Sequence, residues 1–300
     1  MIPIFPNFVR LSLVMKQDIE RYIFQFQSYS DYNFNSLWSY NTKEMIEVSL
    51  LHDNLVVKFT DYLTGNQFLS FIGRNMLLAT LEELFLYLEN EKLPNALKLI
   101  PQEVVESMKD FSHGYSVRED EENHDYILSV EKLVSFSGNK LRGKRNFLNR
   151  FHKHYPSVIV VPLNLSDPSL QSEIIELFLL WQENKQASDK DTEIEKTAIR
   201  RLLGIAGGSN CFSIGMYDGK KLIAFSINEI THDGYGLIHF EKANTDYVGV
   251  YTVMKHEIAK FLEQKGVRFI NYEQNLGIPS LKKAKESYQP VKFLKKYTIS

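Results

Sequence analysis

The chain has 300 residues, enough for one large domain or two of ordinary size, and its apolar fraction of 44% fits a globular protein with a buried core. Its single cysteine, Cys211, excludes an intrachain disulfide and fits a reducing compartment. No apolar run approaches the roughly 18 residues that a transmembrane helix needs, and the first residues lack the basic start of a signal peptide. A cytoplasmic protein without a transmembrane segment is therefore predicted.

Positive charge is concentrated in two segments of a chain whose net charge is −2. Residues 137–156 carry six Lys or Arg and no acid, and residues 282–296 carry six Lys and one Glu, which leaves −13 on the rest. Two basic segments on an acidic body predict a local anionic partner, such as phosphate, nucleic acid or a lipid headgroup. The alternative is two solvated helix faces.

The first half alternates short strands and helices. Apolar spacing and turn residues predict helices at 15–27, 76–90 and 101–111, and strands at 54–59, 68–73, 96–100 and 124–129. A basic bridge follows at 130–154, in which Gly138 and Asn139 separate two helices.

The second half has a clearer order of elements. Strands are predicted at 157–163, 211–217, 220–230, 234–243, 267–272 and 290–299, and helices at 168–186, 191–208, 248–266 and 280–288. Asp218-Gly219 joins the first two of three consecutive strands and is a strong hairpin signal.

Three meandering strands followed by helix, strand, helix and strand is the order of the GCN5-related N-acetyltransferase (GNAT) fold. The first half looks like a shorter copy of this plan. The predicted class is therefore α/β (α+β), with two tandem GNAT-like (acyl-CoA N-acyltransferase) domains built on mixed, mostly antiparallel sheets flanked by helices. The predicted domains are residues 1–129 and residues 130–300, the second beginning with the basic helix.

The basic helix is amphipathic, with two exceptions. Its apolar arc holds Leu141, Phe147, Leu148 and Phe151, and its opposite arc holds Arg142, Arg145, Arg150 and Lys153. Lys140 and Lys144 fall on the apolar side, one turn apart. Either their stems snorkel to water, or their ammonium groups face a cleft that holds an anion.

A second group of candidate residues lies in the stretch HFEKANTDYVGVY, 239–251. Strand alternation predicts Glu241 on the same face as His239, and Lys242 on the other. An acid and a base near a strand end, just before a helix, suit the edge of an active site.

The loop that follows is where a GNAT fold carries the pattern Q/R-x-x-G-x-G/A, whose backbone N–H groups bind the coenzyme A pyrophosphate. Here it reads Asn244-x-x-Tyr247-x-Gly249. Tyr247 would crowd the pyrophosphate, which counts against ordinary coenzyme A binding.

The third group lies in NYEQNLGIPSLKKAKESYQP, 271–290. Glu273 follows a strand and Gly277 makes the turn, and lysines occupy the next short helix. A carboxylate beside several ammonium groups keeps its charge and can orient or deprotonate an amine. The alternative is a surface ion-pair network.

The segments KLRGKRNFLNRF, HFEKAN with GVY, and NYEQNLGIPSLKKAKESYQPVKFLKKY, in this order, resemble the family of the phosphatidylglycerol lysyltransferase C-terminal domain, a domain of unknown function in many bacterial proteins. The resemblance covers most of the chain. It implies two tandem GNAT-like folds joined by a helix. Membrane-bound members of the family move an aminoacyl group from aminoacyl-tRNA to a lipid headgroup, and related tandem folds transfer amino acids from tRNA onto peptidoglycan precursors.

This chain departs from the family pattern at two positions. The usual N-R-E-Q-D-L-G reads Asn271-Tyr272-Glu273-Gln274-Asn275-Leu276-Gly277 here. Tyr272 replaces an arginine and Asn275 replaces an acid. These changes, and the absence of an attached transmembrane region, bear on the lipid acceptor more than on the fold.

The predicted function is transfer of an aminoacyl or acyl group from an activated anionic donor, aminoacyl-tRNA or acyl-CoA, to an amine or hydroxyl acceptor. Glu241 and Glu273 are the candidate catalytic residues. The candidate residues for binding the donor and its phosphates are Lys140, Lys144, Arg145, Asn146, Lys242, Asn244, Gly249, Tyr251, Asn271, Lys282, Lys283 and Lys285.

The sequence leaves two alternatives to this function: a non-catalytic module that binds an anion or RNA, and a coenzyme A-dependent N-acyltransferase. Peripheral contact with lipid is compatible with either basic segment. No metal site is predicted, because the histidines are scattered and Cys211 reads as a core residue of a strand.

Overall fold

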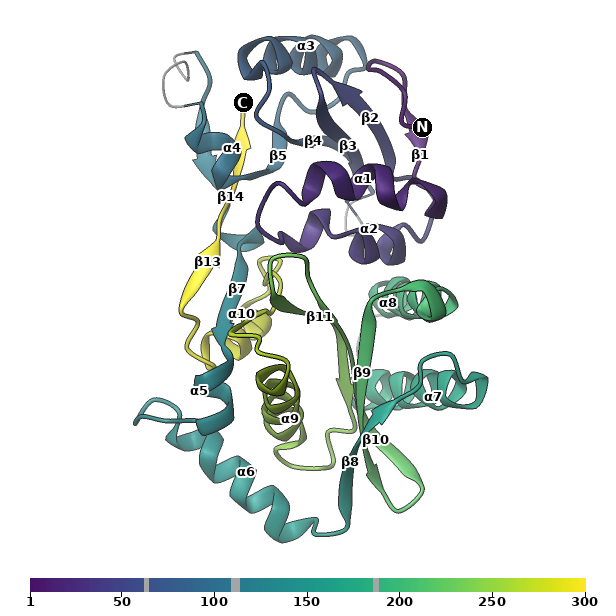
Figure 1. Cartoon of the computed structure of the whole chain (residues 1–300), viewed down its shortest axis with the longest axis vertical. Coiled ribbons are helices and arrows are strands. Elements are labelled where there is room, and N and C mark those ends of the chain that lie inside the picture. Colours follow the sequence, from purple (N-terminus) through teal and green to yellow (C-terminus); the bar gives the residue numbers. More distant parts are fainter. Residues whose placement is uncertain (62–64, 109–113, 186–188) are drawn as a thin grey trace. The chain divides into compact units, whose positions relative to one another are not determined.

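The computed structural model describes residues 1–61, 65–108, 114–185 and 189–300, and the chain forms two compact units (Figure 1). The first unit contains Met1–Asp125 and Leu294–Ser300, and the second contains Tyr126–Phe293. The predicted division between residues 129 and 130 lies near the first crossing of the chain, but it does not include the return of the last residues to the first unit.

The first unit is built on one mixed sheet. Its strands, in spatial order, are β1 (Val9–Arg10), β2 (Glu47–Leu51), β3 (Asn54–Thr60), β4 (Gln67–Ile72), β5 (Leu97–Pro101), β14 (Lys296–Ile299) and β6 (Val117–Glu119). The helices of this unit are α1 (Lys16–Ile23), α2 (Phe34–Tyr40), α3 (Leu77–Asn90) and α4 (Gln102–Glu106). Among the described strands of this sheet, β4 and β5 pair in parallel and the other strand pairs are antiparallel.

The last strand, β14, is inserted between β5 and β6 and is antiparallel to both. Its first residue, Lys296, is fully buried and donates from Nζ to Asp125 Oδ1 at 2.7 Å, and it also pairs with Asp31. Asp125 in turn accepts from Ser30 N–H at 2.8 Å and from Ser30 Oγ at 2.6 Å. The C-terminal strand is therefore held in the first sheet by a buried charge network as well as by its backbone.

The second unit is built on a sheet with the spatial order β13-β7-β12-β11-β10-β9-β8. Its strands are β7 (Asp125–Ser129), β8 (Val158–Leu163), β9 (Cys211–Asp218), β10 (Lys221–Ile230), β11 (Tyr235–Ala243), β12 (Phe269–Asn271) and β13 (Lys292–Leu294). Its helices are α5 (Val130–Ser135), α6 (Arg142–His154), α7 (Pro168–Lys185), α8 (Asp189–Gly204), α9 (Val250–Gln264) and α10 (Pro279–Glu286).

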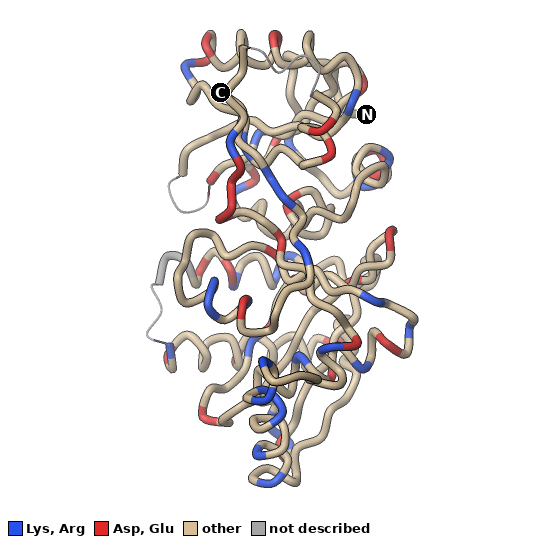
Figure 2. Tube along the Cα trace, turned by 90° about the vertical axis from the view of Figure 1, so that its left-hand side faces the viewer, with Lys and Arg blue, Asp and Glu red and all other residues tan. Residues whose placement is uncertain are grey.

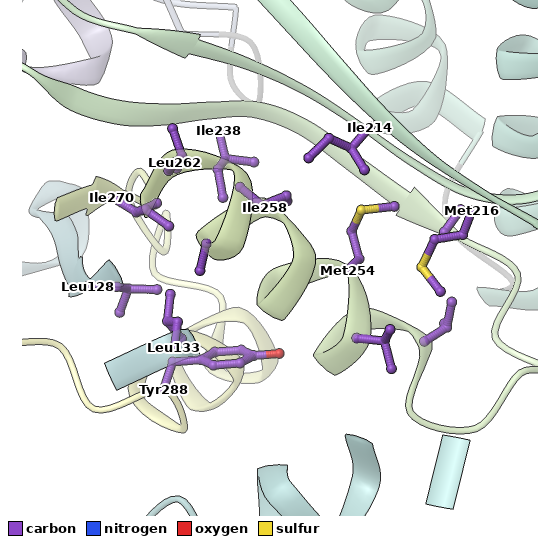
Figure 3. Packing of buried hydrophobic residues seen from close by; sticks show 14 of the residues in the cluster. Leu128, Leu133, Ile214, Met216, Ile238, Met254, Ile258, Leu262, Ile270 and Tyr288 are labelled. Atoms are coloured by element: carbon purple, nitrogen blue, oxygen red, sulfur yellow. The ribbon is translucent and has the colours of Figure 1, made fainter. Parts of the chain in front are cut away.

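Helices cover both faces of this second sheet. Figure 1 shows α9 on one face, and α7 and α8 on the other. The sequence of α9 explains its packing, because Met254, Ile258 and Leu262 recur at helical spacing and are all buried. They face Ile214 and Ile238 of the sheet (Figure 3). The helix and the sheet thus share one hydrophobic core.

One glycine allows this close approach of helix to sheet. A Cβ built on Gly236 of β11 would lie 2.5 Å from Leu262 Cδ1, which no real contact shows. A larger residue at this position would force the Leu262 side chain of α9 to move.

The predicted order of elements in the second half is confirmed, with one correction. The strand predicted over 290–299 is two strands, β13 and β14, which belong to different sheets. In the first half, β1, α2, β2 and β6 were not predicted. The predicted ends of the 101–111 and 168–186 helices fall partly outside the described residues.

Among the described residues, no helix combines the length and the apolar character that crossing a lipid bilayer requires.

Candidate functional site

A buried pair of opposite charges lies between the second sheet and α9. Glu241 comes from β11 and Lys255 from α9, and their side chains are 6% and 0% exposed. Lys255 Nζ donates to Glu241 Oε2. The other carboxylate oxygen, Oε1, is buried and has no hydrogen-bond partner among the described residues. An unsatisfied buried polar group is costly, so this oxygen is a candidate acceptor for a donor group or a cation.

A β-bulge determines which way Glu241 points. In the pairing of β10 with β11, Ile227 faces Phe240 and Asn228 faces Ile238, so His239 is an extra residue in its strand. Glu241 consequently faces α9, whereas His239 hydrogen-bonds to Glu229 on the opposite side of the sheet. The prediction that His239 and Glu241 share a face was wrong, because strict alternation fails across a bulge.

An aromatic ring lies against the buried ammonium groups. The ring of Tyr272 has Lys255 Nζ at 3.6 Å and Lys285 Nζ at 4.2 Å from its centroid. Lys285 also donates to the backbone carbonyl of Tyr272, which places this lysine inward from α10. Burial, and then the negative charge of Glu241, raise the pKa of the Tyr272 hydroxyl well above its usual value. The ring therefore stabilises two cations while its hydroxyl stays protonated.

Lys144 reaches the same cluster from α6. Its Nζ lies 3.8 Å from the centroid of the Tyr288 ring. Burial and then the positive charge of Lys255 lower the pKa of Lys144 to about 8, and Glu241 opposes this. Lys144 therefore exchanges a proton near neutral pH, which an exposed lysine does not.

Two further tyrosines line the cluster. Tyr251 of α9 accepts a hydrogen bond from the backbone N–H of Ala243 at 3.3 Å, and the Tyr288 ring packs beside Leu133 (Figure 3). Burial and the charge of Glu241 raise the pKa of both hydroxyls. Glu241 is thus surrounded by protonated hydroxyls and ammonium groups in a site shielded from water.

The loop after β12 is shaped by side chains that hold its backbone. Asn271 Oδ1 accepts from the N–H of Glu273 at 2.8 Å, and Glu273 adopts a left-handed φ of +54°. Asn275 Oδ1 accepts from Gly277 N–H at 2.9 Å, while its amide donates to Tyr126 Oη at 3.1 Å. Glu273 lies close enough to Lys255 for its charge to raise the pKa of that lysine against the effect of burial. Asn271 is therefore a loop-shaping residue, and Glu273 contributes charge.

Most basic residues of the segment 137–156 remain outside the cluster. Figure 2 shows them along α6, at the lower end of the molecule. The prediction that Lys140 lies on the helix was wrong, because α6 begins at Arg142; Lys140 and Asn146 are exposed. Arg145 donates from Nη1 to the carbonyls of Phe136 and, at 3.0 Å, Gly138, so it holds the chain that leads into α6.

The remaining predicted residues are spread over other surfaces. Lys242 points to the opposite face of the sheet, where its Nζ donates to Glu195 at 2.6 Å. Asn244 accepts from Asn184 Nδ2 at 3.1 Å. Lys282 and Lys283 are exposed on α10. Of the basic residues predicted to bind the donor, the structure brings only Lys144 and Lys285 to Glu241.

The first turn of α9 is covered by α6. Gly249, which precedes the helix, has φ +93°, and a Cβ there would lie 3.3 Å from the Phe147 carbonyl oxygen. The N–H of Val248 donates to Tyr155 Oη at 3.4 Å, and Tyr247 Oη donates to Asp218 at 2.9 Å. The backbone N–H of Val248 and the hydroxyl of Tyr247 therefore already have protein partners just before this helix end.

The sequence did not lead to Lys255. It marked Tyr272 only as a departure from the family pattern, and Tyr288 only as part of the segment 271–290. The signal for Lys255 was present, since it follows Tyr251 by one helical turn and precedes Ile258 by another on the apolar arc of α9. This is the same feature that identified Lys144. No pattern in the sequence marks the two tyrosines as parts of the cluster, because their contacts come from separate loops.

Comparison with known proteins places the chain in a family. Residues 23–300 match the family described as "Phosphatidylglycerol lysyltransferase, C-terminal", so the chain belongs to that family. A conserved protein of unknown function from Bacteroides thetaiotaomicron has 26% sequence identity and a TM-score of 0.83, with 100% of this chain and 99% of that one covered. None of the curated proteins compared with this chain matches it.

Two more distant structures share the fold. L-PGS from Bacillus licheniformis has 13% identity and a TM-score of 0.63, with 100% of this chain and 93% of that chain covered. A tandem GNAT protein from the clavulanic acid biosynthesis pathway has 8% identity and a TM-score of 0.50, with 97% of each chain covered. The fold of this chain is thus the tandem GNAT-like arrangement that the order of elements predicted.

Proposed function

We propose that the second unit transfers an aminoacyl group from an activated anionic ester, with aminoacyl-tRNA as the donor, to an amine or hydroxyl acceptor. Family membership supports the reaction class. The observation that carries the proposal is the buried Glu241, whose one oxygen pairs with Lys255 while the other has no hydrogen-bond partner among the described residues.

Glu241 binds the aminoacyl group in this proposal. An aminoacyl ester carries a free α-ammonium group, which an acetyl group lacks. That ammonium would donate to Glu241 Oε1 and remove the cost of an unsatisfied buried oxygen. The nearby aromatic rings of Tyr251, Tyr272 and Tyr288 suit a cation, because their faces carry negative charge density. The site therefore favours an aminoacyl donor over an acetyl donor.

Lys144 acts as the general base. Its pKa of about 8 leaves part of the amine neutral under mildly alkaline conditions. The acceptor's nucleophilic atom bonds to the ester carbonyl carbon while Lys144 takes its proton. The bond from that carbon to the ribose oxygen of the tRNA breaks, and this oxygen takes the proton from Lys144. A bound ammonium beside Glu241 lowers the pKa of Lys144 further, so donor binding itself favours the neutral base.

The exposed basic side of α6 binds the phosphates of the donor. Arg142, Arg150 and Lys153 are exposed on the same helix that delivers Lys144 inward. When ammonium and guanidinium groups bind a phosphate backbone, counterions are released from the phosphates. Binding therefore weakens as the salt concentration rises. Arg145 has no such role in the proposal, since backbone carbonyls occupy its guanidinium.

The coenzyme A alternative is disfavoured by the first turn of α9. Coenzyme A needs the N–H groups of this turn for its pyrophosphate. Here Phe147 packs against Gly249, and Tyr155 accepts from the N–H of Val248.

The direct test is transfer of a radiolabelled amino acid from aminoacyl-tRNA to hydroxyl and amine acceptors, compared with release of coenzyme A from acetyl-CoA. Glu241→Gln should lower the rate at least 100-fold, and Glu263→Gln, a change at an exposed acid on α9, should leave it unchanged. The wild-type kcat/KM, which reports the protein without bound donor, should rise with pH through about 8. Lys144→Met should abolish this rise, while Lys153→Met, at an exposed lysine of the same helix, should keep it. Transfer from acetyl-CoA but not from aminoacyl-tRNA would refute the proposal.

A further inference from the structure

Three neighbouring strands bring Cys211, Glu229 and His239 together on the face of the second sheet that is opposite α9. Cys211 of β9 pairs in register with Glu229 of β10. His239 Nε2 lies 3.1 Å from Glu229 Oε2, because the bulge in β11 turns this histidine to their side. A sulfur, a carboxylate oxygen and a ring nitrogen, one from each residue, lie within 4.8 Å of one another.

The cluster is enclosed and is held by rigid elements. His239 and Glu229 are 5% and 8% exposed, whereas Cys211 is only partly buried. All three residues belong to neighbouring strands of one sheet, and strands position side chains more accurately than loops do. A ligand could therefore approach from the side of Cys211 and meet donors that are already in place.

We propose that Cys211, Glu229 and His239 form a binding site for one thiophilic divalent cation, with Zn²⁺ as the best fit. A thiolate, an imidazole and a carboxylate are three of the donors that Zn²⁺ prefers, and three protein ligands leave a fourth position for water or substrate. The sulfur and nitrogen donors select against Mg²⁺ and Ca²⁺, which prefer oxygen. The two anionic donors neutralise the charge of the cation.

This site is independent of the transfer reaction proposed above. It lies across the sheet from Glu241, and its residues contribute nothing to the cluster with Lys255. Each of its three ligands comes from a different strand, and their spacing in the sequence matches no linear metal-binding motif. For this reason no metal site was predicted from the sequence. The hydrogen bond between His239 and Glu229 also satisfies both side chains when no cation is bound.

The first experiment titrates the untagged, reduced, full-length wild-type protein with Co²⁺, which reports a bound thiolate through a charge-transfer band in the near ultraviolet. Cys211 is the only cysteine in the chain, so any such band arises from this site. The band should saturate at one equivalent, and one equivalent of Zn²⁺ should remove it by competition. If excess Co²⁺ gives no thiolate band, the proposal is overturned.

The second experiment identifies the other ligands. His239→Gln and Glu229→Gln should each weaken Co²⁺ binding at least tenfold, whereas His152→Gln, an exposed histidine on α6, should not change it. A folded His239→Gln variant that binds Co²⁺ as tightly as wild type would overturn the three-ligand site. If a variant fails to fold by circular dichroism, the wild-type band and its competition by Zn²⁺ decide the question.

Discussion

At the scale of single residues, the pairing of Glu241 with Lys255 sets the electrostatics of the candidate site. Both side chains are withdrawn from water, and the attraction between them offsets a desolvation cost of several kcal/mol per ion. Removing one partner leaves the other charge buried and unpaired. Removing both takes away one charge of each sign, so neither partner is left unpaired.

This gives the first prediction. Lys255→Met should lower the free energy of unfolding by about 3–5 kcal/mol, because Glu241 then lacks its counter-ion. The double variant Glu241→Gln/Lys255→Met should regain much of this loss. Urea denaturation of the wild type, both single variants and the double variant measures the coupling. Strictly additive losses would show that the two charges do not depend on each other.

The second prediction concerns the protonation of Lys144. Carbon-13 NMR of the reductively methylated protein should show one lysine resonance that titrates at about 8 and is missing in Lys144→Arg. Because the charge of Glu241 raises this pKa, Glu241→Gln should move the titration to lower pH. A titration that stays in place in Glu241→Gln would separate Lys144 from the buried pair.

Single residues also show how much of the candidate site could be predicted from the sequence. Lys144 was identifiable, because a lysine on an apolar helical arc contradicts the pattern of its neighbours, and Lys255 carries the same mark. The direction of Glu241 was not identifiable, since it depends on one extra residue in the pairing of β11 with β10. Register is a property of two strands, and a single strand's sequence does not contain it.

At the scale of elements, the contact of α6 with α9 fixes both Lys144 and the first turn of α9. Gly249 is the residue that permits it, since a side chain there meets strain at φ +93° and a backbone oxygen at 3.3 Å. Gly249→Ala should therefore cost about 1–3 kcal/mol of stability. The matched control is Gly143→Ala, within α6, where nothing lies within 4 Å and alanine should stabilise the helix by about 0.5–1 kcal/mol.

Thermal and denaturant unfolding of the two alanine variants would test this contrast. Equal effects of the two substitutions would mean that the close contact at Gly249 does not constrain α9.

Two adjacent lysines at the start of the last strand allow a second comparison, between a buried and an exposed ion pair. Lys296 of β14 is 0% exposed beside Asp31 and Asp125, whereas Lys295 is 39% exposed beside Glu119. Lys296→Met leaves two carboxylates without their cation and should cost about 3–5 kcal/mol. Lys295→Met removes a surface pair and should cost about 0–1 kcal/mol. Denaturation midpoints of the two variants check this, and a mild effect of Lys296→Met would imply that water reaches the buried network.

At the scale of the whole molecule, the chain crosses between the two units twice. It enters the second sheet through β7, which lies between β12 and β13, and it returns to the first sheet through β14, which lies between β5 and β6. The sequence indicated both strands, and the order of elements was enough to predict the fold class. It could not indicate that the last strand belongs to the first sheet, because pairing between distant segments leaves no local pattern in either one.

This connectivity leads to a prediction about fragments. A fragment of residues 125–294 contains every strand of the second sheet, together with its core around α9. A fragment of residues 130–300, cut where the sequence predicted the domain boundary, loses β7 and leaves β12 and β13 without their shared neighbour. It also keeps β14, whose pairing partners β5 and β6 lie in the missing part.

The fragment 125–294 should therefore unfold cooperatively and give dispersed amide resonances, and 130–300 should not. The physical reason is that loss of the internal strand β7 leaves backbone groups of its neighbour β12 unpaired. It also removes Ile127 and Leu128, both fully buried in the intact chain, and so uncovers the apolar side chains that they contact. Circular dichroism melting curves and two-dimensional NMR of the two fragments give the comparison. If 130–300 folds as cooperatively as 125–294, then β7 is dispensable to the second sheet, and the unit that carries Glu241 and Lys255 begins later in the chain than the strand pairing indicates.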